Sequence, residues 1–176
     1  MCRIIPYESS HRRGVLAVVQ DVHREYNFSW DSEGYHRDLY EIESSYLENG
    51  GMFWVLADSG DAVAGCVGVT LHDRHRPAHD PQGSMPIERD SALKYAELHR
   101  LYLRKDSRGQ GWGRRMLDEA VAHARANGCV RMIAWSDVVL KNAHALYLKY
   151  GFVQEGRRIC ADPDQSRESG FWRQPL

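Results

Sequence analysis

Three alternating glycines between a strand-like segment and a helix-like segment constrain the fold of this chain most. Gly109, Gly111 and Gly113 stand in the sequence RKDSRGQGWGRR of residues 104–115. Glycine reaches positive φ angles and lets a ligand approach main-chain N–H groups, and a helix that begins at the turn adds unpaired N–H donors and the positive end of its dipole. The pattern predicts a turn that can bind a diphosphate, although short glycine motifs also occur in ordinary surface loops.

The flanking segments favour a strand–turn–helix unit. Residues 92–104 alternate and are rich in Leu and Tyr, as in a partly buried strand, and residues 113–128 place apolar side chains on one helical face before an Asn-Gly stop signal. A dinucleotide-binding GxGxxG motif would need glycine where Arg114 or Met116 stands, and a Walker A loop would need a Gly-Lys-Ser/Thr ending. The sequence excludes both motifs.

Composition predicts one domain over residues 1–176, because this length is ordinary for a single core. The net charge of −1, with both signs interspersed, gives no basic field for nucleic acid, so a small-molecule partner is expected. The apolar runs are shorter than the roughly 18 residues that span a bilayer, and residues 1–10 lack the apolar core of a signal peptide. We therefore expect no membrane contact and a cytoplasmic location, with four single cysteines as free thiols.

The hydrophobic periodicity predicts an ordered series of strands and helices. A first helix is expected to begin at an N-cap Ser9 or Ser10, and a helix over residues 141–150 to end at a glycine. Residues 130–135 should form a strand parallel to residues 92–104, since a helix crosses between them. The other predicted strands are residues 2–7, 52–57, 62–71, 152–159 and 170–173, and the other predicted helix is residues 35–46.

Residues 72–91 are dominated by Pro, Gly and charge and are expected to form an exposed loop. The loop holds His72, Asp73, His75 and His79, but no pair of them has helical spacing in a helical context. We expect no metal site.

Two motifs about thirty residues apart carry a resemblance to a known family. Residues 108–113 (RGQGWG) fit the Arg/Gln-x-x-Gly-x-Gly/Ala signature of the GNAT superfamily of acyl-CoA-dependent N-acyltransferases, and residues 142–152 (NAHALYLKYGF) resemble its N-x-x-A-x-x-L-Y-x-x-x-G-F helix. The resemblance covers nearly the whole chain. It implies a mixed α/β fold with a central, mostly antiparallel mixed sheet of six to seven strands, a parallel, splayed pair at the CoA site, and about four flanking helices.

The resemblance also implies which residues bind acetyl-CoA, the expected co-substrate. The diphosphate would rest on the amides of residues 109–114, and the pantetheine arm would pair with the main chain near Leu101 to Leu103. Asn142 and Lys149 match positions that line the arm, although Asn142 can instead cap its own helix and Lys149 can be a solvated lysine. The expected cofactor-binding residues are Leu101, Tyr102, Leu103, Arg108, Gly109, Gln110, Gly111, Trp112, Gly113, Arg114, Asn142 and Lys149.

Acyl transfer to an amine needs a base for the ammonium proton and benefits from an acid at the departing sulfur. Tyr147 matches the family tyrosine near the sulfur and is the candidate acid, with packing on the apolar helix face as the alternative. Glu97 is the candidate base, because it lies on the strand facing the expected acyl site, in phase with Tyr95 and His99. Structural pairing of Glu97 with Arg100 or with another strand is the alternative interpretation.

Three points of the chemistry stay open in the sequence. His99 has an ordinary pKa near neutrality and can replace Glu97 as base. A bulge in this strand would change which of residues 97–100 face the site. Direct transfer in a ternary complex is expected, and Cys66 is the one thiol that a covalent route could use.

The expected reaction is transfer of an acetyl group to the primary amine of a small molecule. Acetylation of a protein or peptide, and a non-catalytic acyl-CoA-binding or sensing module, are the alternatives, and a homodimer is expected from the resemblance. Acceptor selectivity should come from residues 26–46 and from the loop of residues 73–90. The aromatic and polar members of the first segment are Tyr26, Phe28, Trp30, Asp31, Glu33, Tyr35, His36 and Asp38.

Overall fold

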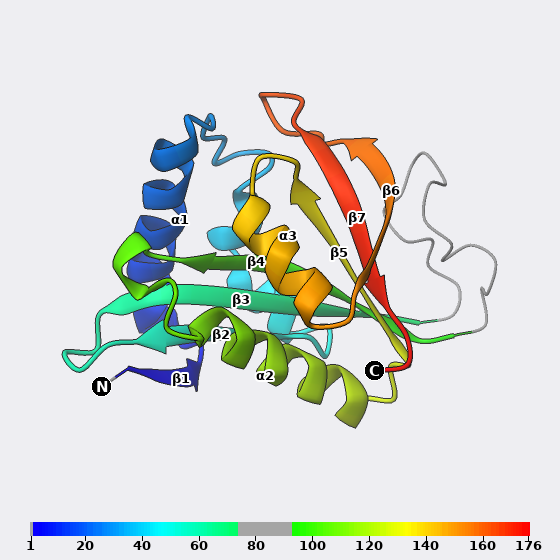
Figure 1. Ribbon diagram of the computed structural model, residues 1–176. Coiled ribbons are helices and arrows are strands. Elements are labelled where there is room, and N and C mark those ends of the chain that lie inside the picture. The colour runs from blue at the N-terminus through cyan, green and yellow to red at the C-terminus, as the bar shows by residue number, and fades with distance from the viewer. Residues whose placement is uncertain (1, 74–92) are drawn as a thin grey trace.

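The protein folds around one seven-stranded sheet with helices on both faces, as Figure 1 shows for the computed structural model, which describes residues 2–73 and 93–176. The strand order is β1-β2-β3-β4-β5-β7-β6. The strands are β1 (Arg3–Pro6), β2 (Met52–Ala57), β3 (Val63–His72), β4 (Tyr95–Leu103), β5 (Arg131–Asp137), β6 (Val153–Ile159) and β7 (Arg167–Arg173). The helices are α1 (Arg12–Tyr26), α2 (Trp112–Ala126) and α3 (Lys141–Lys149), with 3₁₀ turns at Ser9–His11, Arg37–Leu39 and Lys105–Ser107 and a π-helical turn at Glu43–Leu47. The predicted fold class is confirmed.

The β4–β5 pair is the parallel pair that the sequence predicts. Register pairing runs from Tyr95 opposite Arg131 to Leu98 opposite Ala134, and beyond these residues the two strands continue without pairing to each other. On its other edge β4 carries a bulge, because His99 faces Gly68 and Tyr102 faces Cys66, so that two residues oppose Val67 alone. The strands therefore diverge toward their carboxyl ends, at the level of the bulge.

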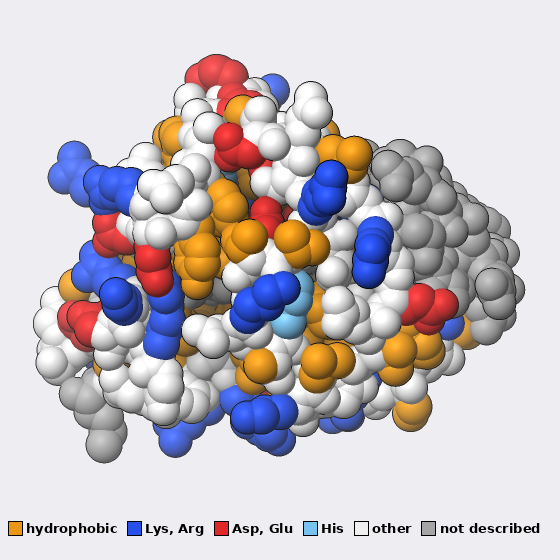
Figure 2. Space-filling model, turned by 45° about the horizontal axis from the view of Figure 1, so that its top comes forward, with side chains coloured by type: hydrophobic (Ala, Val, Ile, Leu, Met, Phe, Trp, Pro, Cys, Tyr) orange, Lys and Arg blue, Asp and Glu red, His pale blue; other side chains and the backbone are white. Residues whose placement is uncertain are grey.

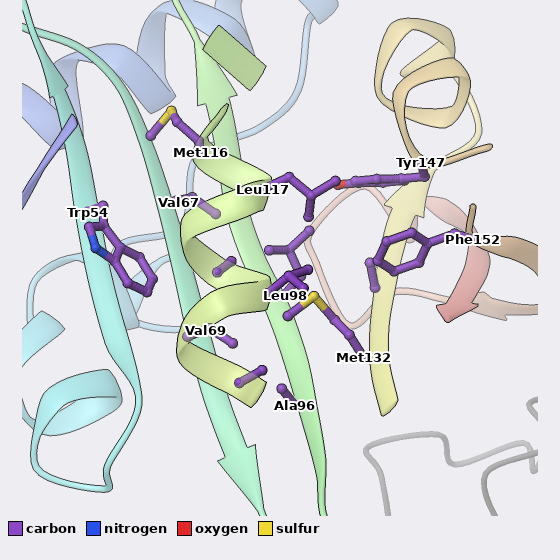
Figure 3. Packing of buried hydrophobic residues seen from close by; sticks show 14 of the residues in the cluster. Trp54, Val67, Val69, Ala96, Leu98, Met116, Leu117, Met132, Tyr147 and Phe152 are labelled. Carbon is purple, nitrogen blue, oxygen red and sulfur yellow. The ribbon is translucent and has the colours of Figure 1, made fainter. Parts of the chain in front are cut away.

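Helices α1 and α2 cover opposite faces of the sheet. Helix α1 buries Val15, Val18, Val19 and Val22 on the face that carries Phe53, Val55 and Cys66. Helix α2 packs the predicted face against β2, β3 and β4, with Met116 and Leu117 over Val67, Val69 and Leu98 (Figure 3). Burying each such side chain contributes roughly 1.5–3 kcal/mol, so these two faces fix the sheet between them.

The predicted helix over residues 35–46 is wrong as a continuous element. Its apolar members Leu39, Ile42 and Tyr46 are buried as the spacing requires, but the backbone is a 3₁₀ turn followed by a π-helical turn. The main-chain oxygen of Tyr35 accepts a 2.6 Å hydrogen bond from the Arg100 guanidinium, and the N–H of Leu39 donates to His36 instead. A buried arginine thus takes the carbonyl that an α-helix would use.

The predicted serine N-cap of the first helix is also wrong. The chain enters α1 through the 3₁₀ turn Ser9–His11, whose N-cap is Glu8, and the N–H of Glu8 donates to the imidazole Nδ1 of His11. Within residues 2–73 and 93–176, no helix is both long enough and apolar enough to cross a membrane.

Candidate active site

Two cavities meet where β4 and β5 diverge. The first, here called the turn cavity, has a volume of about 550 Å³ and lies over the glycine turn. The second, here called the Glu97 cavity, has a volume of about 570 Å³ and holds both Glu97 and Tyr147 in its lining. Leu101, Tyr102, Leu140 and Ala143 line both cavities, so the two form one continuous depression. Figure 2 shows a hollow with hydrophobic side chains in it and Lys and Arg side chains around it.

The glycine turn has the geometry of an anion-binding site. Gly109 and Gly111 have φ angles of 76° and 84°, and a Cβ added to either would meet no heavy atom within 4 Å. Gly111 is the N-cap of α2, and the N–H of Arg115 is the first in the helix to reach a helical acceptor, the oxygen of Gly111 at 3.2 Å. The preceding N–H groups of the first turn therefore point out of the helix end, and the residues present fit a diphosphate.

Gly113 has a different function from the other two glycines. A Cβ on Gly113 would stand 3.3 Å from a methyl carbon of Leu146. This contact shows that the third glycine lets the first turn of α2 approach α3 closely.

All of the predicted cofactor-binding residues except Gln110 and Trp112 line the turn cavity. The side chain of Gln110 donates to the main-chain oxygen of Asp106 at 2.8 Å. The ring of Trp112 lies 4.8 Å below the guanidinium of Arg115 and packs on the core. These two side chains support the turn, and only their main-chain groups remain candidates for ligand contact.

Arg108 lines the turn cavity and is also a brace. Its guanidinium makes two 2.8 Å hydrogen bonds to the Glu25 carboxylate near the end of α1, and its Nε donates to the oxygen of Leu103 at 3.0 Å. The hydrogen bonds from Arg108 lower the pKa of Glu25. Arg108 therefore ties α1 to the end of β4, beside the turn.

Asn142 and Lys149 project from α3 into the turn cavity lining. The N-cap of α3 is Leu140, which makes no side-chain capping bond, and Asn142 lies inside the first turn. The interpretation of Asn142 as the N-cap of its helix is wrong.

Glu97 is the buried carboxyl group of the second cavity. It lies on the same sheet face as Tyr95 and His99, as the alternation predicts, and its residue is 6% exposed. Burial raises the pKa of Glu97 to about 7, with a smaller opposing effect of the Arg158 charge. Its carboxylate is 3.8 Å from Nε2 of His72 and makes no pairing with Arg100, which bonds Asp38 instead. A carboxyl group that titrates near neutrality suits a general base.

His99 has the wrong electrostatic environment for a base. Burial, with the Arg100 charge as a second cause, lowers the pKa of His99 to about 3. Its Nε2 lies 2.9 Å from the hydroxyl of Thr70, which also lies 2.9 Å from Nε2 of His72. The bulge explains why the Arg100 charge lies near His99. Arg100 takes a φ of 53° at the bulge, and its guanidinium bonds Asp38 beside the imidazole of His99.

Tyr147 comes from α3 and lines the Glu97 cavity. Its ring packs at 5.2 Å from that of Phe171 and 5.6 Å from that of Phe152, and Figure 3 shows its hydroxyl end pointing away from α3 toward the central strands. Burial raises the pKa of Tyr147 above the ordinary value, so the hydroxyl stays protonated and able to donate. Both the packing interpretation and the cavity position apply to this residue.

The Cys66 thiol lines neither cavity. Its Sγ lies 3.2 Å from the oxygen of Arg100, and burial raises its pKa to about 12. A thiol in this state is a poor nucleophile. In the described part of the chain no group of three His, Cys, Asp or Glu side chains could hold a metal ion. His75 and His79 lie outside the described residues.

Sequence reasoning missed the contribution of β6 and β7. Arg158 donates to the Glu168 carboxylate at 2.6 Å and stands 4.3 Å over the ring of Trp135, and all three residues line the Glu97 cavity. The indole N–H of Trp135 is buried and has no hydrogen-bond partner among the described residues. The sequence predicts strands over residues 152–159 and 170–173 in this region, but a strand pattern does not show which cavity a strand lines.

The predicted acceptor segment contributes only part of its residues. Phe28 and Tyr35 line the Glu97 cavity, and Tyr26 lines the turn cavity. Ser29 binds Asp164 through its N–H and its hydroxyl, both at 2.7 Å, which joins this segment to the β6–β7 connection. The loop prediction for residues 74–90 lies outside the described residues. The remaining members, which line neither cavity, are Trp30, Asp31, Glu33, His36 and Asp38.

Comparison with known proteins finds relatives that are named N-acetyltransferases. The chain is 31% identical to N-acetyltransferase 8F1 of Rattus norvegicus over 136 residues. This aligned region is 77% of this chain and 51% of that protein. It is 32% identical to N-acetyltransferase 8 of Mus musculus over 122 residues, a region that is 69% of this chain and 47% of that protein. The chain thus spans about half the length of the curated relatives it matches.

Solved structures share the fold at low identity. A GNAT-family acetyltransferase from Staphylococcus aureus Mu50 superposes with a TM-score of 0.78 at 18% identity, over 99% of both chains. A chain of the NatC complex bound to Gag peptide and CoA superposes with a TM-score of 0.70 at 13% identity, over 99% of this chain and 98% of that one. The model of the acetyltransferase (GNAT) family matches residues 16–152. The chain belongs to the acetyltransferase (GNAT) family.

Proposed function

We propose that this protein is an N-acetyltransferase that moves the acetyl group of acetyl-CoA to a primary amine of a small molecule, by direct transfer in a ternary complex. One observation carries the proposal. A cavity with an anion-binding helix end and a cavity with a near-neutral buried carboxyl group share a boundary at the gap between β4 and β5. A thioester carrier and an amine that occupy the two cavities would meet at that boundary.

The turn cavity supports acetyl-CoA as the co-substrate. The N–H groups at the start of α2 and the Arg114 guanidinium would hold the diphosphate, and Asn142 and Lys149 would contact the arm. The β4 main chain at Leu101 and Tyr102 has no β5 partner in the described structure and would pair with the amides of the arm. Bound there, acetyl-CoA supplies an activated acyl group.

The Glu97 cavity supports the proton transfers. Burial raises the pKa of Glu97 to about 7, and its carboxylate form can accept the ammonium proton before attack. The hydroxyl of Tyr147 can donate a proton to the departing sulfur. Residues 101, 102, 140 and 143 lie between the two cavities and keep apolar surface around the reacting atoms.

Charge and enclosure favour a small cationic amine. Four carboxyl groups line the Glu97 cavity, and its two arginines are each paired with a carboxylate. Aromatic rings from Phe28, Tyr35 and Trp135 supply apolar surface beside them. The contact of Ser29 with Asp164 joins two segments beside the cavity, which favours a small amine over a long peptide.

A thiol-release assay with acetyl-CoA over a panel of small aromatic and aliphatic amines, with lysine-bearing and free N-terminal peptides as the comparison arm, tests the proposal. The expected result is turnover with a subset of the small amines and at least tenfold lower kcat/KM for the peptides. Peptide preference would replace the proposal with peptide acetylation. Acetyl-CoA binding by calorimetry without turnover of any amine would indicate a sensing module.

A further inference from the structure

Two buried imidazoles join the acceptor segment to α1. Nε2 of His36 lies 2.8 Å from Nε2 of His23, and the two residues are 1% and 5% exposed. His23 lines the Glu97 cavity, while His36 lies behind the cavity wall and lines neither cavity. Neither residue takes part in the proton transfers proposed above.

The hydrogen bonds at the outer ends of the pair determine both tautomers. The Nδ1 of His23 lies 3.0 Å from the oxygen of Val19, which can only accept, so this nitrogen carries a proton. The main-chain N–H of Asp31 donates to Nδ1 of His36 at 3.1 Å, so this nitrogen carries none. Neutral His36 therefore has its proton on Nε2 and donates it to the unprotonated Nε2 of His23.

The chain of three hydrogen bonds holds two ring protons and no more. A third proton on Nε2 of His23 would face the Nε2 proton of His36. A third proton on Nδ1 of His36 would face the N–H of Asp31, so either position puts two donors against each other. The surroundings add to this restriction. Burial and the Arg100 charge lower the pKa of His36 to about 4, and burial lowers the pKa of His23. The charged groups that face the pair are Arg100 from β4, Asp31 and Asp38 from the acceptor segment, and Asp162 and Asp164 from the β6–β7 connection.

The two imidazoles are also in contact with three aromatic side chains of the acceptor segment, two of which line the Glu97 cavity. The ring of Trp30 stacks on His36 at 4.0 Å, and the ring of Phe28 meets His23 at 5.4 Å edge to face. Tyr35 packs against His36 at 4.8 Å. Since Phe28 and Tyr35 line the Glu97 cavity, any movement of the imidazoles changes the shape of the acceptor side.

We propose that His23 and His36 are positioning residues of the acceptor site, whose neutral imidazole–imidazole hydrogen bond holds Phe28 and Tyr35 in the wall that the amine contacts. The proposal rests on the proposed function for the identity of the ligand. Loss of the pair weakens amine binding and leaves acetyl-CoA binding unchanged, because the turn cavity contains neither imidazole.

The tautomers are tested without any substrate by ¹⁵N-resolved NMR of the imidazoles. The expected result is a proton on Nδ1 of His23 and on Nε2 of His36 at pH 7. In an acid titration the imidazole signals and the main-chain amide signals of Phe28 and Tyr35 should shift together, with a midpoint below pH 6. Other tautomers, or an ordinary imidazole midpoint near pH 6.5 without the amide shifts, would overturn the proposal.

The kinetic test uses His36→Phe, which keeps a ring for Trp30 to stack on and removes both polar contacts. The expected result is a rise of about tenfold in the KM for the amine, with the acetyl-CoA KM within about twofold of wild type. His23→Phe should have the same effect, and the double variant should be no worse than either single one, because both act through one hydrogen bond. His123→Phe is the matched control, since His123 lies on α2 and bonds the oxygen of Gly50 away from both cavities.

The outcomes separate this inference from the proposed function. An unchanged amine KM in His36→Phe, or an equal rise in the acetyl-CoA KM, overturns the positioning role. Should His36→Phe not fold, the NMR measurement on the wild-type protein decides. If no amine is acetylated, the proposed function fails, while the tautomers and the amide shifts still test the imidazole pair.

Discussion

Replacing Glu97 with glutamine should lower activity and raise stability in the same pH range. The carboxyl group is buried, and burial raises its pKa from 4.5 to about 7. At about 1.4 kcal/mol per unit of pKa, this rise corresponds to about 3 kcal/mol by which ionisation is less favourable in the folded protein than in the unfolded chain. Glutamine has nearly the same shape and removes this ionisation.

The sign of the stability effect follows from the raised pKa. The folded protein binds the Glu97 proton more tightly than the unfolded chain does. The stabilisation from this proton is complete below the unfolded-state pKa near 4.5 and is lost as the pH rises through the folded-state pKa of about 7. The free energy of unfolding of Glu97→Gln, relative to wild type, should therefore increase by up to about 3 kcal/mol between pH 4.5 and pH 8.5. Urea unfolding at both pH values measures this difference.

The effect on activity is measured as the ratio of the kcat/KM values of the two proteins at each pH. Protonation of the amine substrate affects both proteins equally, so it cancels in this ratio. The kcat/KM of wild type divided by that of Glu97→Gln should reach a plateau of about 10²–10³ above pH 8 and fall about tenfold per pH unit below pH 6.5. Glu119→Gln, the same change on the exposed face of α2, should leave both activity and stability within error. A ratio independent of pH, or a variant that loses stability at pH 8.5, would refute the reasoning.

Three further changes test other parts of the structure. Tyr147→Phe keeps the ring packing and should lower kcat about 10²-fold in the thiol-release assay, with a melting temperature within roughly 2 °C of wild type; an unchanged kcat removes the hydroxyl from the mechanism. Gly111→Val and its control Gly128→Val place a β-branched residue at positive φ angles of 84° and 77°, so each should lower the free energy of unfolding by about 1–3 kcal/mol. Only Gly111→Val should raise the KM for acetyl-CoA, by tenfold or more. Asp38→Ala removes the partner of a buried guanidinium and should cost about 3–5 kcal/mol in urea unfolding, whereas Glu41→Ala, at the exposed ion pair with Arg37, should cost under about 1 kcal/mol.

Local patterns predicted the elements that use one kind of backbone geometry throughout. The alternation of residues 92–104 predicted β4 and the face shared by Tyr95 and Glu97, and the periodicity after the glycines predicted the buried face of α2. They failed at residues 35–46, where correct apolar spacing coincides with a broken helix. The cause is a contact with Arg100, more than fifty residues away, which no local pattern contains.

The family motifs marked the turn cavity more completely than the Glu97 cavity. The diphosphate turn and the start of α3 are continuous in sequence, so their residues could be named together. The wall made by Arg158, Trp135 and Glu168 comes from three strands that become neighbours only in the sheet. Each residue alone resembles an ordinary strand residue, so the sequence gives no signal for their meeting.

The sequence by itself determined the glycine turn, the crossover that makes β4 and β5 parallel, and the residue types available for acid and base chemistry. The tertiary structure decided which of those groups can act. Burial lowers the pKa of His99, with the Arg100 charge as a second cause, and burial raises the pKa of Glu97 to about 7. Folding also brings His23 of α1 and His36 of the acceptor segment into one hydrogen bond. A pKa and a hydrogen bond depend on desolvation and on neighbours from distant segments, which are set only when the chain is folded.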